Sequence, residues 1–223
     1  MSRSVILFIL LMFISIKMNS QYKYLALGDS YTIGKSVESE KTWPYFLRDY
    51  LTNNGFSFSK PEVIADNSWR TAHLLEAIDK ANFEQKSFDL VSLLIGVNNQ
   101  YDETPFDQFV EEFELLLQKA ISFNKYGATT TFVVGIPDYS LTVYAQKNGK
   151  ADAAADIKRH NAVAQEICEK YQVVYYSIFE LSQQMADKPQ FFIEDELHPS
   201  ADQYYEWTQH YGKNVLKTLS NAL

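Results

Sequence analysis

Two patterns of apolar residues alternate along the chain. Short, nearly continuous apolar runs predict buried strands, and these are residues 22–27, 61–65, 88–96, 129–136 and 172–178. Longer segments, in which apolar residues recur every three or four positions, predict helices over residues 42–54, 71–81, 104–124, 151–171 and 201–219. This alternation predicts a five-stranded parallel sheet covered by helices on both faces, a three-layer α/β/α sandwich.

The N-terminus departs from this alternation. Arg3 precedes an apolar run over residues 5–16, which is too short to span a bilayer comfortably and matches the hydrophobic region of a secretory signal. Residues 1–20 are therefore predicted to be a signal peptide, and the protein to be exported, either periplasmic or secreted. Because Met18 suits the cleavage site poorly, an uncleaved anchor is one alternative, and a buried N-terminal helix is another. Residues 21–223 are predicted to form a single domain.

Composition and charge narrow the range of partners. Hydrophobic residues make up 46% of the 223 and aromatic residues 15%, which is enough apolar surface for a sizeable core. The formal net charge of −8 becomes −10 without residues 1–20, which contain Arg3 and Lys17 and no acid. Such a protein repels nucleic acids and anionic membranes, so neither is an expected partner. Cys168, the single cysteine, excludes an internal disulfide and is expected to be buried.

Polar side chains follow each predicted strand. In open parallel sheets, ligands bind beyond the carboxyl ends of the strands, where these segments meet. The segments supply a serine, amides, aromatic rings, carboxylates and a histidine, which are the groups that acyl transfer needs. They are GDSYTIG (28–34), DNSWRT (66–71), GVNN (96–99), PDYS (137–140) and EDELHPS (194–200).

The Gly-Lys-Ser at residues 34–36 raises a different possibility, a phosphate-binding loop. That motif needs four residues between its first glycine and the Gly-Lys pair, with a helix starting at the lysine. Here five residues separate Gly28 from Gly34, and a polar segment without a helical pattern follows. We therefore interpret Lys35 as a solvated loop charge.

Ser30, Asp195 and His198 are the candidate catalytic residues. A serine hydroxyl needs a base to take its proton, and the base needs a third group to orient it. In DELH a turn brings side chains three residues apart together, so Asp195 can contact His198. Pro199 disfavours helical geometry at His198, and Ser200 followed by a glutamine three residues later predicts a capping box for the last helix.

Donors for an oxyanion are available on three of these loops. The candidates are the backbone N–H of Ser30, the backbone N–H of Ser68 and the side-chain amide of Asn98. Asp29 is expected to brace the turn beside the serine by accepting backbone hydrogen bonds. Aromatic side chains also occur in the segments that follow the strands. Each is expected either to line the substrate pocket or to be a core ring; they are Trp69, Tyr101 and Tyr139.

Taken together, GDSYTIG, GVNN and DELH, in this order and on these loops, resemble the GDSL, or SGNH, hydrolases over residues 22–220. The resemblance implies a flavodoxin-like sandwich that hydrolyses esters and thioesters without a metal or other cofactor. It implies Ser30 as nucleophile, His198 as base and Asp195 as its orienting group, with the Ser30 N–H and Asn98 as oxyanion donors. The family usually has glycine where this chain has Ser68.

The predicted function is that of an exported serine ester hydrolase acting through an acyl-enzyme. Its expected substrates are small-molecule or saccharide esters carrying acyl or acetyl groups, and stable insertion in a membrane is not expected once the signal is removed. A lysophospholipase or thioesterase of the same family is one alternative, and a non-catalytic module that binds acylated glycans is another.

The remaining histidines show no metal-ligand spacing and are expected to be structural or exposed; they are His73, His160 and His210.

Overall fold

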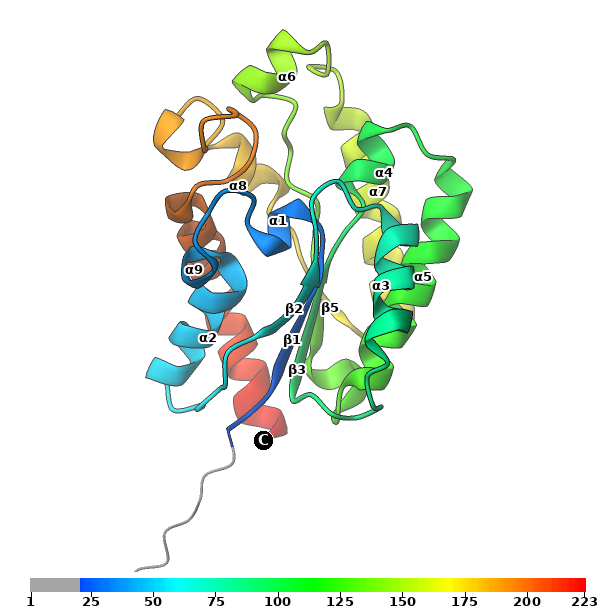
Figure 1. The fold of residues 1–223 in the computed structure, drawn as a ribbon, viewed down its shortest axis with the longest axis vertical. Coiled ribbons are helices and arrows are strands. Elements are labelled where there is room, and N and C mark those ends of the chain that lie inside the picture. The colour runs from blue at the N-terminus through cyan, green and yellow to red at the C-terminus, as the bar shows by residue number, and fades with distance from the viewer. Residues whose placement is uncertain (1–20) are drawn as a thin grey trace, which may run out of the picture.

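The five apolar runs form one parallel sheet in the computed structural model, which describes residues 21–223 (Figure 1). The strands lie in the order β2-β1-β3-β4-β5, and each neighbouring pair is parallel. Their bounds are β1 (Tyr24–Gly28), β2 (Glu62–Ala65), β3 (Leu90–Leu94), β4 (Thr131–Val134) and β5 (Val174–Tyr176). Every residue of the central strands β1 and β3 is buried, as continuous apolar runs require.

The predicted long helices are all present, with ends that shift by a few residues. The helix predicted over 71–81 coincides with α3, and the last helix extends three residues beyond its predicted end. The bounds are α1 (Ser30–Ile33), α2 (Trp43–Asn53), α3 (Thr71–Ala81), α4 (Val97–Tyr101), α5 (Phe106–Phe123), α6 (Val143–Lys147), α7 (Ala154–Lys170), α8 (Phe179–Gln183) and α9 (Ala201–Ala222), with single 3-10 turns at Ser39–Lys41, Gly127–Thr130 and Pro189–Phe191.

Helices cover both faces of the sheet, which confirms the predicted three-layer sandwich (Figure 1). On one face α2 and α9 pack side by side and bury large aromatic rings, among them Trp43 and Trp207. On the other face α3, α5 and α7 bury the apolar stripe of α5, including Phe113 and Leu116, together with Cys168. Burial raises the pKa of the Cys168 thiol to about 12, so this side chain acts as an apolar core residue.

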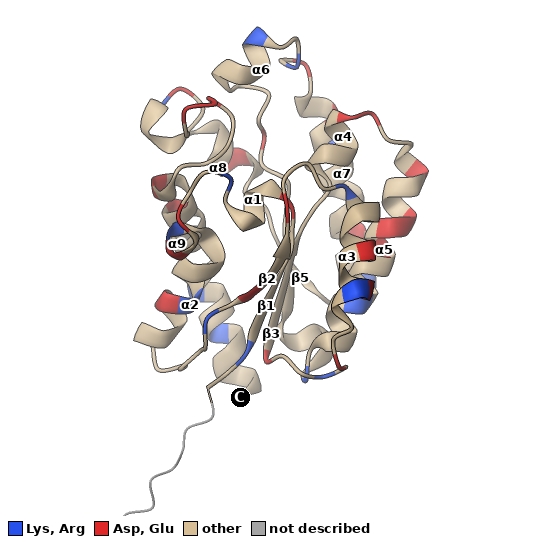
Figure 2. Ribbon diagram, in the orientation of Figure 1, with Lys and Arg blue, Asp and Glu red and all other residues tan. Residues whose placement is uncertain are grey.

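Charged side chains lie mainly on the outer helices and the loops, while the central strands carry almost none (Figure 2). Within residues 21–223, no helix is both long and apolar enough to cross a bilayer. The predicted signal peptide over residues 1–20 lies outside the described residues.

Two short helices at the carboxyl edge of the sheet, α1 and α4, were not predicted. Each spans only about one turn, which is too short for a repeating apolar pattern. In α1 the side chain of Asp29 caps the first turn, and Gly34, in the left-handed region at φ 77°, ends it. A side chain at position 28 would collide with Thr32 and with the Leu94 carbonyl, so glycine lets α1 fold tightly onto β1.

The capping box predicted for the last helix is wrong. Ser200 is the residue that precedes α9, but its hydroxyl donates to the carbonyl of Gln190 (2.6 Å) instead of accepting from the helix. Gln203 is buried, and its amide contacts the sulfur of Met185 at 3.7 Å. The hydroxyl ties the start of α9 to the loop before it, a tertiary contact that the local pattern could not indicate.

Candidate active site

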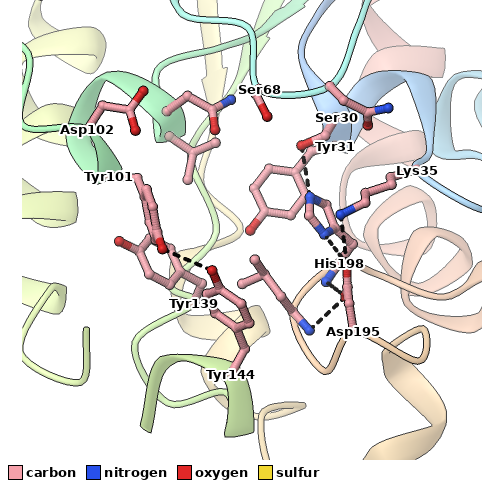
Figure 3. Close-up of a pocket in the computed structure, with 14 residues that line it drawn as sticks. Ser30, Tyr31, Lys35, Ser68, Tyr101, Asp102, Tyr139, Tyr144, Asp195 and His198 are labelled. Carbon is pink, nitrogen blue, oxygen red and sulfur yellow. Dashed lines mark hydrogen bonds and ion pairs between the residues drawn. The ribbon is translucent and has the colours of Figure 1, made fainter. Parts of the chain in front are cut away.

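Ser30 lies at the first position of α1, directly beyond the carboxyl end of β1. Its side chain is buried, and its Oγ lies 3.0 Å from Nε2 of His198, which belongs to the loop before α9 (Figure 3). Asp29, one residue earlier, accepts a hydrogen bond from the N–H of Tyr31 (3.0 Å) and so braces the turn as predicted. Burial raises the pKa of Asp29 to about 7.

Asp195 holds the other side of the His198 ring. His198 Nδ1 lies 2.7 Å from Asp195 Oδ2, while Asp195 Oδ1 accepts the backbone N–H groups of Leu197 (3.0 Å) and His198 (2.9 Å). Burial favours the neutral carboxyl, but these hydrogen bonds and the nearby imidazole outweigh it and lower the pKa of Asp195 to about 2. The structure thus brings Ser30, His198 and Asp195 into one hydrogen-bonded chain.

Burial lowers the pKa of His198 below its usual value, and the carboxylate of Asp195 opposes this only in part. The imidazole is therefore neutral at neutral pH, with Asp195 favouring a proton on Nδ1 and leaving the Nε2 lone pair for the Ser30 hydroxyl. This is the arrangement in which a histidine acts as a general base toward a serine.

The three predicted oxyanion donors line the same cavity as Ser30 (Figure 3). The amide Nδ2 of Asn98 donates to the carbonyl of Trp69 (2.9 Å), which fixes the amide plane and leaves its second hydrogen free for a ligand. Within residues 21–223, neither the Ser30 N–H nor the Ser68 N–H donates a hydrogen bond.

Ser68 adopts φ 58°, the left-handed region that favours glycine. This conformation gives a physical reason for the glycine that the resembling family usually has here. The Ser68 side chain is exposed. The backbone strain of a serine in this conformation is therefore confined to the rim of the cavity.

The second asparagine of GVNN has a structural role. Asn99 is fully buried; its Oδ1 accepts from the N–H of Thr71 (3.0 Å), and its Nδ2 donates to the Thr71 hydroxyl (2.7 Å). That hydroxyl in turn donates to the carboxylate of Glu112 on α5. The network ties α4 to α3 and α5 and thereby holds Asn98 in place.

A cavity of about 250 Å³ opens in front of the Ser30 hydroxyl. Tyr101 and Tyr139, which the sequence left open as either pocket-lining or core rings, both line it. Tyr144 of α6, which sequence reasoning missed, completes an aromatic wall (Figure 3). The hydroxyls of Tyr101 and Tyr144 lie 2.9 Å apart, and the Tyr139 hydroxyl donates to Gln100 (2.7 Å). No local motif marks Tyr144, because α6 reaches the cavity only through the fold.

Trp69 differs from the other two aromatic candidates. It is absent from the cavity wall, and its ring packs against the core cluster beneath α3 and α5. The structure therefore favours the alternative of a core ring. Only the backbone of Trp69 serves the site, through the carbonyl that accepts from Asn98.

Lys35 is a loop residue whose side chain is 40% exposed, but it is not the unpaired, solvated charge that its sequence context suggested. Its Nζ lies 3.2 Å from Asp195 Oδ2, and the side chain lines the cavity. The two residues are 160 positions apart, so no spacing in the sequence could have indicated this contact.

The remaining histidines lie away from this cavity. His73 accepts from the N–H of Arg70 (3.1 Å), His160 is buried against the rings of Phe106 and Phe109, and His210 lies 3.1 Å from the carbonyl of Ser177. Across residues 21–223, no group of three or more His, Cys, Asp or Glu side chains is placed to hold a metal ion.

Comparison with known proteins supports the family resemblance directly. Residues 26–205 match the model of the GDSL-like lipase/acylhydrolase family, which covers most of the chain and all of the site loops. The protein belongs to the GDSL family. It is therefore a carboxylic ester hydrolase by family. Among curated protein sequences, none matches significantly.

Solved structures share the fold of this GDSL hydrolase at low sequence identity. TesA is 17% identical with a TM-score of 0.67, covering 88% of this chain and 99% of its own. A lipase/acylhydrolase from Enterococcus faecalis is 17% identical with a TM-score of 0.68, at 88% and 96%. The psychrotrophic esterase EstA from Pseudoalteromonas sp. is 17% identical with a TM-score of 0.61, at 91% and 96%. These similarities confirm the α/β fold of the GDSL hydrolases.

Proposed function

We propose that this GDSL hydrolase is a serine esterase that works through an acyl-enzyme, with Ser30 as nucleophile, His198 as base and Asp195 as its orienting group. The observation that carries the proposal is the continuous chain from Ser30 Oγ to His198 Nε2 (3.0 Å) and from His198 Nδ1 to Asp195 (2.7 Å). A cavity large enough for a small ester opens at the serine end of this chain.

The chemistry follows from these positions. As Ser30 Oγ bonds to the ester carbonyl carbon, its proton passes to His198 Nε2, and the resulting imidazolium is stabilised by Asp195. The carbonyl oxygen becomes an oxyanion, which the N–H groups of Ser30 and Ser68 and the amide of Asn98 can stabilise. The imidazolium then protonates the leaving alcohol as the carbon–oxygen bond breaks. A water molecule, deprotonated by His198, releases the acid from Ser30 by the same route.

The walls of the cavity favour an acyl or acetyl ester of a saccharide, or another short-chain ester, over a long acyl chain. The aromatic side chains of Tyr101, Tyr139 and Tyr144 lie beside the polar groups of Asn67 and Asp102. Sugars present both apolar faces and hydroxyl groups, so a wall of rings interspersed with amide and carboxylate groups is suited to them. A lysophospholipid or a long-chain thioester would place a purely apolar chain against several polar groups.

A substrate screen tests this specificity. Among p-nitrophenyl esters, we expect kcat/KM to be highest for the acetate and to fall through butyrate, octanoate and dodecanoate. For acetylated oligosaccharides we expect kcat/KM to exceed the value for p-nitrophenyl acetate. The highest value on dodecanoate or on a lysophospholipid would favour the alternative of a lysophospholipase or thioesterase. Binding of acetylated oligosaccharides without release of acetate would favour the non-catalytic module.

Export is the second part of the proposal. It is supported by the cation and the apolar run at the N-terminus, Arg3 and residues 5–16. We expect the intact mass of protein recovered from the producing cells to correspond to a chain that begins near Gln21. A mass that retains residues 1–20 would contradict cleavage and favour the anchor.

A further inference from the structure

The turn that follows α1 places Lys35 next to Asp195, the carboxylate that orients His198. Gly34 ends α1 in the left-handed conformation, and the N–H of Lys35 donates back to the carbonyl of Ser30 (3.3 Å). The chain therefore reverses directly behind the nucleophile, and the Lys35 side chain extends to Asp195, with Nζ 3.2 Å from Oδ2 (Figure 3). One short segment thus supplies both the Ser30 hydroxyl and a cation for the orienting carboxylate.

The carboxylate of Asp195 is fully engaged once Lys35 is included. Oδ1 accepts two backbone N–H groups, and Oδ2 is shared by the imidazole of His198 and the ammonium of Lys35. Four donors in different directions fix the plane of the carboxylate and hence the ring of His198. The ammonium also offsets part of the negative charge that would otherwise favour a protonated imidazole.

We propose that Lys35 is a positioning residue of this active site, which holds the Asp195 carboxylate in place and extends to lower pH the range in which His198 is the neutral, active base. The inference rests on the proposed function, since it concerns the base of that reaction. A cation beside the Asp195–His198 pair disfavours a second positive charge on the ring. His198 therefore remains neutral to a lower pH than it would beside Asp195 alone.

The other ionisable groups around His198 do not account for this effect. The phenols of Tyr31, Tyr139 and Tyr204 remain neutral, because burial raises the pKa of each. Besides Asp195 and Lys35, the nearby groups from the packed elements are Asp29, Tyr31, Asp102, Tyr139, Tyr144 and Tyr204. Asp29 titrates near neutral pH but contacts the backbone of Tyr31, and it is unchanged in any Lys35 variant. A difference between wild type and a Lys35 variant therefore reports the ammonium.

The pH dependence of kcat/KM for p-nitrophenyl acetate tests the proposal, together with an NMR titration of the His198 ring in the same proteins. We expect Lys35→Met and Lys35→Gln to raise the midpoint of the acid limb, and the NMR midpoint of His198, by about half a pH unit. Lys35→Arg is expected to restore the wild-type midpoint. In molar salt, where charges are screened beyond about 3 Å, the difference should shrink.

Lys41→Met is the matched control. Lys41 is an exposed lysine of the 3-10 turn that follows the Lys35 loop; it pairs with Glu38 and is absent from the cavity wall. Its midpoints are expected to match wild type. Unchanged midpoints in folded Lys35→Met and Lys35→Gln proteins would overturn the inference, and so would an equal shift in Lys41→Met. The NMR titration needs no turnover, so it tests Lys35 even if Ser30→Ala shows that the proposed esterase mechanism is wrong.

Discussion

Replacing Ser30 by alanine is expected to lower kcat for ester hydrolysis by at least about 10⁴-fold while the protein stays folded. The Oγ atom is the only side-chain hydroxyl within hydrogen-bond distance of His198 Nε2 in residues 21–223 (3.0 Å), so its loss removes both the nucleophile and the proton that the base would take. The substitution deletes one buried atom and leaves the Asp29 cap and the turn of α1 intact.

Rates for p-nitrophenyl acetate and intact-protein mass after treatment with an alkyl phosphonate ester measure this effect. Wild-type protein is expected to gain one phosphonyl group, and Ser30→Ala none. Ser39→Ala, which removes an exposed hydroxyl from the nearby 3-10 turn, is expected to behave as wild type in both assays. Equal hydrolysis rates in Ser30→Ala and wild type would exclude Ser30 as the nucleophile.

The position of the Ser30 hydroxyl beside its base depends on residues from both ends of the chain. Gly28 lets α1 fold tightly onto the end of β1, and Asp29 caps the turn that presents the serine. The base arrives from the opposite end of the chain, on the loop that precedes α9. The motifs could therefore indicate the nucleophile and the base as candidates, but only the fold brings His198 within 3.0 Å of Ser30.

The layers of the fold were predictable because long, buried elements have strong periodic patterns. The continuous apolar run of β3 has to be buried on both faces of the sheet, and the apolar repeat of α5 has to pack against such a face. Together these patterns predict a parallel sheet between two layers of helices. The one-turn helices α1 and α4 were not predictable in this way. Their geometry comes from capping and from buried contacts such as the hydrogen bonds of Asn99 to Thr71.

Within the site, residues with local partners were predictable and those with distant partners were not. Asp195 and His198 lie three positions apart, so a turn suffices to join them. Lys35 meets Asp195 only through tertiary structure, and Tyr144 reaches the cavity on a short helix without any motif. The orientation of Trp69 was likewise undetermined, because nothing in its neighbours shows whether the ring turns toward the core or toward the cavity.

The backbone carbonyl of Trp69 orients the Asn98 amide, which is why we expect Asn98 to contribute strongly to stabilising the oxyanion. It accepts one hydrogen of the Asn98 amide (2.9 Å) and so holds the other ready before the substrate arrives. A donor that is oriented in advance stabilises the oxyanion without reorganising during the reaction, and this is why such donors contribute strongly to catalysis. Substitutions other than proline leave the backbone N–H groups of Ser30 and Ser68 in place, so Asn98 is the donor that a side-chain truncation can remove.

Asn98→Ala is expected to lower kcat about 10²- to 10³-fold with little change in KM, since the amide is needed mainly where negative charge develops. Steady-state kinetics with p-nitrophenyl acetate measure the two constants separately. Asn54→Ala is a matched control, because the exposed Asn54 amide also donates to a backbone carbonyl, that of Tyr50 (2.7 Å), but at the end of α2 and outside the cavity wall. A rise in KM with unchanged kcat would assign Asn98 to ground-state binding and leave the two backbone N–H groups as the oxyanion donors.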